Sequence, residues 1–169
     1  ILAAKPNEGH FAISKMEEFK HVVVLTQNID GLHQRSGSTN VLELHGSIIR
    51  IKCTVCDFSD TITENFELFP PKCKCGSILR PDVVWFGEQL SQDIWQHAIN
   101  EASLCDVMVI AGTSLAVSPA NTLPMYAKQN GAILIEINPE RTVMSNDMDL
   151  SIQSTSARIL PEILSVLKK

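Results

Sequence analysis

Several short apolar runs in this chain do not alternate with polar residues, and this property limits the folds that the chain can adopt. The runs are residues 21–26, 41–44, 107–111 and 132–138. A strand with one face in water alternates apolar and polar residues, whereas a strand buried on both faces does not. Between the runs, apolar residues recur at helical spacing, as Ile94, Ala98 and Ala102 do within residues 91–104. Buried strands that alternate with helices predict an α/β fold built on a parallel sheet.

The expected helices and strands follow from the same periodicity and from their end signals. We expect helices at residues 7–19, 91–104, 118–130 and 158–168 and a further short strand at 150–153. Asn7 is a good N-cap, and Phe19 falls on the apolar face of the first helix. Asn130-Gly131 is typical of a helix C-terminus, and Pro124 predicts a kink. The run at 107–111 is expected to be a buried strand.

Small polar residues follow three of the apolar runs directly. These segments are Thr26–Asp30, Gly112–Ser114 and Asn138–Glu140. Because the carboxyl ends of parallel strands share one edge of a sheet, such segments can hold a ligand there. They are also ordinary turn formers, so each segment alone indicates little. Together they indicate a ligand site at the edge of the sheet, where His45, directly after another run, can act as a base near neutral pH.

Four of the five cysteines form two close pairs, Cys53-x2-Cys56 and Cys73-x-Cys75. In a secreted chain these pairs could form disulfides, but no secretory signal is visible, so a zinc site is favoured. Two thiolate pairs can fill a tetrahedral Zn²⁺ site completely, which makes the metal structural rather than catalytic. Residues 49–80 are therefore expected to form a small zinc-ribbon module inserted into a domain made of residues 1–48 and 81–169.

Composition excludes few functions but argues against two. The formal net charge of −5 lacks the basic footprint of nucleic-acid-binding proteins, and it suits cationic, lysine-rich peptides. No apolar run approaches the roughly 20 residues that span a bilayer, so no membrane partner is expected. Since the first residue is Ile1, the sequence is expected to begin within a longer chain.

Five segments of the chain resemble, in order, the motifs of the sirtuin family of NAD-dependent protein-lysine deacylases. Thr26–Asp30 resembles the TQNID motif, Leu44–Gly46 the HG motif, Arg80–Glu88 the RPxVVxFGE motif, Gly112–Pro119 the GTSLxVxP motif and Ile137–Asn138 the late IN motif. The resemblance runs from about His10 to the C-terminus. It implies a Rossmann-like fold. Trp85 resembles the residue found at this position in the bacterial and desuccinylase-like branch of the family.

The resemblance also implies a role for each matching residue. His45 would be the catalytic general base. Residues binding the NAD cofactor would be Gln27, Asn28, Ile29, Asp30, Gly112, Thr113, Ser114, Asn138, Glu140 and Ser156. Residues binding the acyl-lysine peptide substrate would be Val84, Trp85, Phe86, Gly87, Glu88 and Val117. The zinc ligands would be Cys53, Cys56, Cys73 and Cys75. The products would be nicotinamide, deacylated lysine and O-acyl-ADP-ribose, and the enzyme would be a deacetylase or, as the alternative, a desuccinylase.

Compared with the family, residues 1–20 contain no Gly-rich strand–loop–helix of the kind that cradles the NAD diphosphate. The first βα unit of the fold is therefore expected to be missing, and the 169-residue chain alone is expected to be weakly active or inactive. Two alternative functions stay open: a zinc-ribbon interaction module without catalysis, and a protein ADP-ribosyltransferase. The expected location is cytoplasmic.

Overall fold

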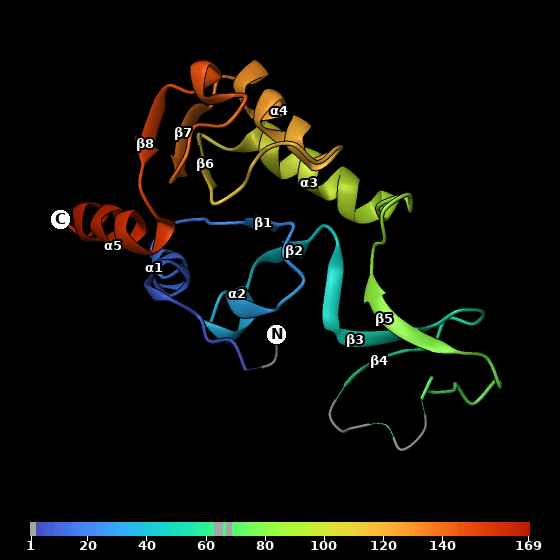
Figure 1. Ribbon diagram of the computed structural model, residues 1–169. Helices are drawn as coiled ribbons and strands as arrows, with labels where there is room; N and C mark the ends of the chain where they lie inside the picture. The colour runs from blue at the N-terminus through green and yellow to red at the C-terminus, as the bar shows by residue number, and fades with distance from the viewer. Residues whose placement is uncertain (1–2, 63–65, 67–68) are drawn as a thin grey trace.

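Three small sheets and five α-helices make up this computed structural model, which describes residues 3–62, 66 and 69–169 (Figure 1). The helices are α1 (Glu8–Met16), α2 (Leu32–Arg35), α3 (Gln92–Leu104), α4 (Leu123–Gln129) and α5 (Ser156–Leu167). The strands are β1 (Val24–Thr26), β2 (Val41–Glu43), β3 (Gly46–Cys53), β4 (Ser59–Thr61), β5 (Leu79–Val83), β6 (Val107–Ala111), β7 (Ile133–Asn138) and β8 (Leu150–Gln153). Short 3₁₀ turns lie at Ala120–Thr122 and Ser145–Asp147.

Two of the sheets are parallel, as the unalternating runs predict. β1 pairs with β2, and β6, β7 and β8 form a second sheet in that order. Helices cover both faces of β7: Leu134 packs in a core with Ala127 of α4, whereas Ile137 packs with Ala12 of α1 and Leu160 of α5. The predicted α/β class with helices on both faces is confirmed.

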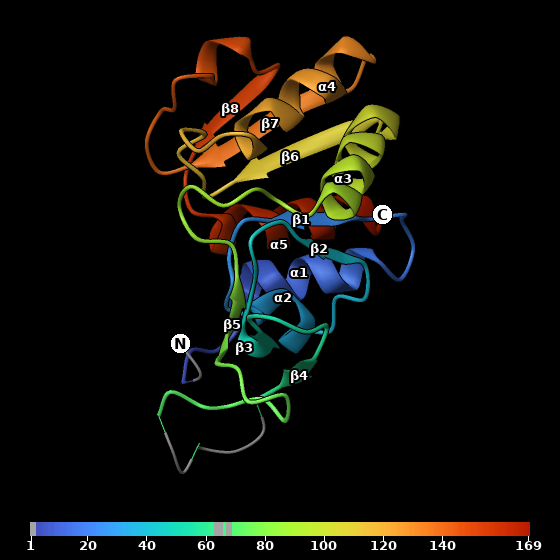
Figure 2. The same cartoon turned by 90° about the vertical axis from the view of Figure 1, so that its right-hand side faces the viewer.

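The third sheet is antiparallel and carries the cysteines. β3 lies between β4 and β5, and this sheet lies at the opposite end of the molecule from β7 and β8 (Figure 1 and Figure 2). Its strands begin at Gly46 and end at Val83, so the sheet extends beyond residues 49–80 on both sides. The division of the chain into two domains stays a prediction.

The prediction of a buried strand at 107–111 is wrong for half of β6. Val107 and Val109 are 46% and 41% exposed, whereas Ile110 is buried. Side chains alternate between the faces of a strand, and only one face of β6 packs in the core with α4. β6 is also an edge strand, since its one partner among the described residues is β7.

Two helices differ from their predicted form at one end. Asn7 caps α1 as expected, with its side chain accepting hydrogen bonds from the amides of Gly9 and His10, but the helix ends at Met16 and leaves Phe19 exposed. Pro124 does not kink a long helix. Instead, it occupies the first turn of α4, where proline is tolerated because the amide there needs no helical partner.

Candidate functional site

A cavity of about 390 Å³ lies where the ends of β1, β2 and β5 meet. It is lined by Gln27, Asn28, Ile29, Asp30, His45, Val83, Val84, Trp85 and Phe86. The structure thus brings together eight residues from three predicted groups: the catalytic base, the first cofactor segment and the first part of the substrate segment. Gly87 and Glu88 continue the substrate segment outside this lining.

The loop at 27–30 keeps its shape through three hydrogen bonds. The Asn28 amide donates to the Thr26 hydroxyl oxygen (3.1 Å), and the Leu32 amide donates to the Asp30 carboxylate (3.0 Å). The carbonyl of Ile29 accepts from the amide of Ile48 on β3 (2.9 Å). Because its own backbone groups are paired in this way, the loop presents the Gln27 and Asn28 side chains to the cavity on a fixed backbone.

His45 is held on both sides by backbone contacts. Its Nδ1–H donates to the carbonyl oxygen of Gln27 (3.0 Å), and its own carbonyl accepts from the amide of Val84 (2.9 Å). Since a carbonyl can only accept, the proton of the neutral ring is on Nδ1, and Nε2 keeps its lone pair. The ring that lines the cavity therefore has an unprotonated nitrogen available for a proton.

Gly46 explains why glycine follows this histidine. Its φ is +76°, and a Cβ atom there would lie 2.1 Å from the carbonyl oxygen of Asp82 on β5. Only glycine lets β3 start so close to β5 in this conformation. The close approach places His45 beside Val84, at the start of the substrate segment.

The segment that follows β5 exposes two aromatic side chains beside the cavity. Trp85 is 53% exposed and Phe86 is 99% exposed. A turn closed by the Glu88 amide and the Trp85 carbonyl (2.9 Å) carries them. The Glu88 carboxylate accepts from the Trp85 amide (3.1 Å) and pairs with Arg80 (3.0 Å), and these two contacts lower its pKa.

The remaining predicted cofactor residues lie at the carboxyl edge of the other parallel sheet. Gly112 to Ser114 follow β6, and Asn138 and Glu140 follow β7. The Gly112 amide donates to the Ile137 carbonyl (3.0 Å), and the Asn138 side chain donates to the Glu140 carbonyl (2.7 Å). Ser156 begins α5, and Val117 is a partly exposed loop residue ahead of Ala120. None of these residues lines the cavity of His45.

A buried carboxylate that the sequence reasoning missed supports the loop after β7. Glu136 is 1% exposed and accepts hydrogen bonds from the hydroxyls of Thr142, Ser145 and Ser151, at 2.5 to 2.6 Å. Burial opposes its ionisation, but these three donors outweigh burial and lower its pKa. The one signal in the sequence was an acid inside an apolar strand.

Replacing Glu136 with glutamine should reduce stability in a pH-dependent manner. We expect the free energy of unfolding to fall by about 1–3 kcal/mol at pH 7, because three hydroxyls, of which that of Ser145 is buried, lose a charged acceptor. A lowered pKa in the folded state means that the stabilisation exists above the unfolded pKa and is lost as the pH falls through the folded one. Urea unfolding of both forms should therefore converge at acidic pH, and a constant difference from pH 7 to pH 3 would contradict this account.

The four paired cysteines meet at one point. Their sulfur atoms all lie within 4.8 Å of one another, with 3.5 Å between Cys53 and Cys75 and 3.6 Å between Cys56 and Cys73. A tetrahedral zinc ion with bonds of about 2.3 Å requires sulfurs at such separations. Contacts from Ser77 lower the pKa of Cys75 to about 6. The backbone of Phe58 lowers the pKa of Cys56, but contacts with the three neighbouring thiols outweigh it and raise that pKa to about 12. The donor set fits a structural zinc ion, despite the single residue between Cys73 and Cys75.

Removal of zinc should unfold the antiparallel sheet before it affects the parallel sheets. Replacing Cys75 with serine, or adding a chelator, is expected to lower the thermal midpoint and to expose Leu79, which packs with Cys53 and Cys73. Bound zinc can be counted by elemental analysis, with about one ion per chain expected. Replacing Cys105, which lies outside the cluster, is the matched control. Zinc content unchanged in the Cys75→Ser variant would contradict the assignment.

Fold and site together define an α/β protein with a histidine-containing cavity at the ends of parallel strands and a four-cysteine metal site. The sequence profile of the Sir2 family matches residues 1–119. NAD-dependent protein deacylase 1 of Caldanaerobacter subterraneus subsp. tengcongensis is 49% identical over 156 residues, which make up 90% of this chain and 64% of that protein. NAD-dependent protein deacylase 2 of Pyrobaculum aerophilum is 45% identical over 171 residues, covering 100% of this chain and 69% of the relative.

Solved structures with a similar fold are also Sir2 proteins. A Sir2 homologue in complex with NAD has a TM-score of 0.94 at 40% identity, covering 99% of this chain and 66% of the other. A Sir2 protein bound to an acetylated peptide has a TM-score of 0.92 at 34% identity, covering 99% of this chain and 73% of the other. The chain belongs to the Sir2 family, the sirtuins, and it spans about two thirds of the length of these relatives.

Proposed function

We propose that this protein is an NAD-dependent protein-lysine deacylase that produces nicotinamide, free lysine and O-acyl-ADP-ribose. The observation that carries the proposal is His45, which lines one cavity with both the 27–30 loop and the exposed 84–86 segment. A base, a cofactor loop and a peptide-facing segment are the parts that such a reaction requires. The names of relatives, which describe NAD-dependent protein deacylases, support it.

NAD fits the polar part of this site. Gln27, Asn28 and Asp30 offer amide and carboxylate groups for a carboxamide and a ribose, and Gly112 and Asn138 stand at the edge of the second sheet for the adenosine half. When bound, NAD supplies the ADP-ribose group that accepts the acyl group. None of the cofactor residues proposed above is assigned to the diphosphate of NAD.

His45 takes the role of general base. Its Nδ1–H is fixed on the Gln27 carbonyl, so the ring has one orientation and Nε2 can accept a proton from a ribose hydroxyl. The amide of Val84 fixes the backbone of the same residue. A base that is already oriented loses little entropy when the reaction begins.

The acyl-lysine peptide is proposed to lie along residues 84–88, with Val117 on its other side. An extended peptide can pair with an exposed segment through main-chain hydrogen bonds, and Trp85 and Phe86 offer apolar surface beside it. Complexes of Sir2 proteins with acetylated peptides support a peptide substrate. We propose no direct nucleic-acid partner and a cytoplasmic location. Among the described residues, no helix is both long and apolar enough to cross a membrane.

The complete protein, incubated with an acetyl-lysine peptide and NAD labelled in the adenylate portion, tests this proposal. Label recovered in O-acetyl-ADP-ribose together with free lysine would support deacylation. Label retained on protein would favour an ADP-ribosyltransferase instead. Neither product, with NAD binding absent in calorimetry, would favour a zinc-ribbon interaction module. A succinyl-lysine peptide assayed in parallel would determine the acyl preference.

A further inference from the structure

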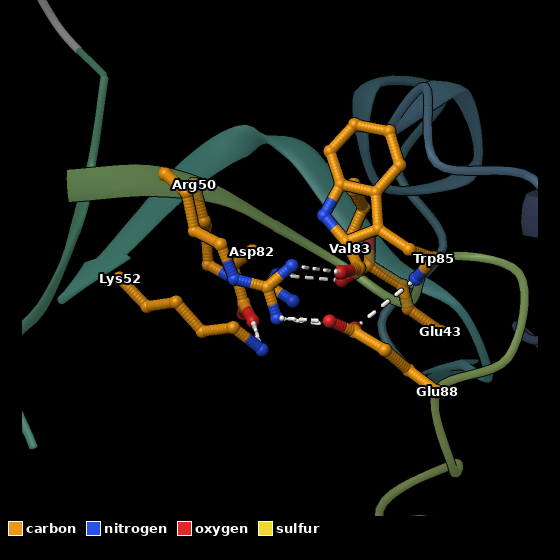
Figure 3. A network of polar contacts seen from close by, with 8 residues as sticks. Glu43, Arg50, Lys52, Asp82, Val83, Trp85 and Glu88 are labelled. Carbon is orange, nitrogen blue, oxygen red and sulfur yellow. Dashed lines mark hydrogen bonds and ion pairs between the residues drawn. The ribbon is translucent and has the colours of Figure 1, made fainter. Parts of the chain in front are cut away.

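Charged side chains from β2, β3 and β5 form a network behind the 84–88 segment (Figure 3). Arg50 is central in this network. Its Nη1 donates to Glu43 (2.5 Å) and its Nε donates to Asp82 (3.2 Å). Lys52 also forms an ion pair with Asp82 (3.0 Å). Among the described residues, Lys52 pairs with no other carboxylate. Arg50 therefore connects β2 and β5, which are not neighbours in any sheet of the part of the chain that the structure describes.

The two carboxylates that Arg50 contacts lie next to the functional residues along the chain. Glu43 ends β2 and precedes His45 by two residues, and Asp82 precedes Val84 by two residues. Figure 3 draws Arg50 together with the two carboxylates that it contacts, Asp82 and Glu43. One side chain therefore joins the strand that leads to the base with the strand that leads to the substrate segment.

The backbone ladder is interrupted where this connection is made. Ser47 of β3 pairs with Asp82, but the next pair is Ile51 with Pro81, so residues 48–50 form a bulge. The displaced amide of Ile48 donates to the carbonyl of Ile29 in the cofactor loop. A bulge weakens the local ladder, and Pro81 has no amide to donate. Backbone pairs of Gly46 with Val83 and of Ser47 with Asp82 hold the strands on the site side of the bulge, and the contact of Arg50 with Asp82 adds a side-chain connection across it.

The burial of Glu43 and the pKa shifts of Arg50 and Asp82 indicate that Arg50 interacts strongly with both carboxylates. The Glu43 side chain is 9% exposed, so without Arg50 it would be a buried and unpaired charge. Partial burial opposes ionisation of Asp82, but hydrogen bonds from Lys52 and Arg50 lower its pKa. For Arg50, the cost of burial is exceeded by its contacts with Glu43 and Asp82, and its pKa is raised.

We propose that Arg50 is a positioning residue for deacylation, which fixes the separation between His45 and the substrate segment 84–88. This inference rests on the proposed function. Arg50 does not line the cavity, so it acts through Glu43 and Asp82 and not on the substrate. Its planar fork is needed to reach both carboxylates, and lysine can replace the charge but not the two-sided contact.

Three variants of the complete protein test the inference: Arg50→Met, Arg50→Lys and, as matched control, Lys52→Met. Lys52 lies on the same strand and shares Asp82, but it does not contact Glu43. The first readout is amide exchange by NMR at Val84, whose hydrogen bond to the His45 carbonyl joins the two segments. The second readout is kcat and KM, for peptide and for NAD separately.

Both Arg50 variants should exchange the Val84 amide about tenfold faster and lower kcat by a similar factor, with the KM for NAD within about twofold of wild type. Lys52→Met should change each quantity less than about twofold. Full rescue by Arg50→Lys would overturn the proposal, and so would an exchange rate at Val84 that rises no more than at Leu134 in the distant core. If Arg50→Met fails to fold, Arg50→Lys decides. An inactive wild type would refute the proposed function, while the exchange rates would still decide whether Arg50 holds the segments together.

Discussion

Replacing His45 with alanine is expected to abolish deacylation while leaving the protein folded. A positioned general base contributes about 10²- to 10⁴-fold to the rate, so kcat should fall by at least two orders of magnitude. The side chain lies at a cavity and is not part of the buried core, so the thermal midpoint should change little. The measurement is release of free lysine from an acetyl-lysine peptide by the complete protein.

The control for this prediction is His97→Ala on α3. His97 is half exposed, contacts Glu101 one turn along the same helix and does not line the cavity. Its replacement should leave kcat within about twofold of wild type. Comparable activity in the His45→Ala and His97→Ala proteins would show that another group accepts the proton, and the mechanism proposed for His45 would be wrong.

Replacing Gly46 with alanine is expected to have the largest effect on folding of any single methyl addition at a glycine. The new Cβ would lie 2.1 Å from the Asp82 carbonyl oxygen, and the backbone is in the left-handed region at φ +76°. Left-handed strain and overpacking each cost about 1–3 kcal/mol, so the free energy of unfolding should fall by roughly 3 kcal/mol or more. Equilibrium urea unfolding measures the change.

Gly131→Ala is the control that separates the cost of left-handed backbone strain from the cost of the steric clash. Gly131 also has a positive φ, at +90°, but no heavy atom lies within 4 Å of the position of its Cβ. The control therefore carries the conformational cost without the contact with β5. A difference of less than about 1 kcal/mol between the two variants would mean that β5 moves aside easily, and that Gly46 does not fix the position of His45.

Local sequence patterns predicted the parts of this molecule that depend on neighbours in the chain. Asn7 caps α1, the unalternating runs become parallel strands, and Gly131 ends α4 with a positive φ. The Cys pairs were also readable, because two close thiol pairs can fill one tetrahedral zinc site.

Features that depend on contacts between distant segments could not be read in this way. Arg50 contacts Asp82, 32 positions away, and the bulge that brings this about has no local sequence signal. Glu136 is an acid in an apolar strand, and its three hydroxyl partners are recognisable only once β7, β8 and the intervening loop are folded. The exposure of Val107 and Val109 likewise depends on which elements cover β6.

β3 links the proposed zinc site to the proposed catalytic base, so the activity should depend on the metal. The strand begins at Gly46, next to the base, and ends at Cys53, a proposed zinc ligand. One eight-residue strand, with a bulge at residues 48–50, therefore joins the proposed zinc site to the proposed catalytic base. Loss of zinc is therefore expected to lower the proposed deacylase activity, although no cysteine of the cluster lines the cavity of His45, and the supply of zinc would then limit the fraction of active protein.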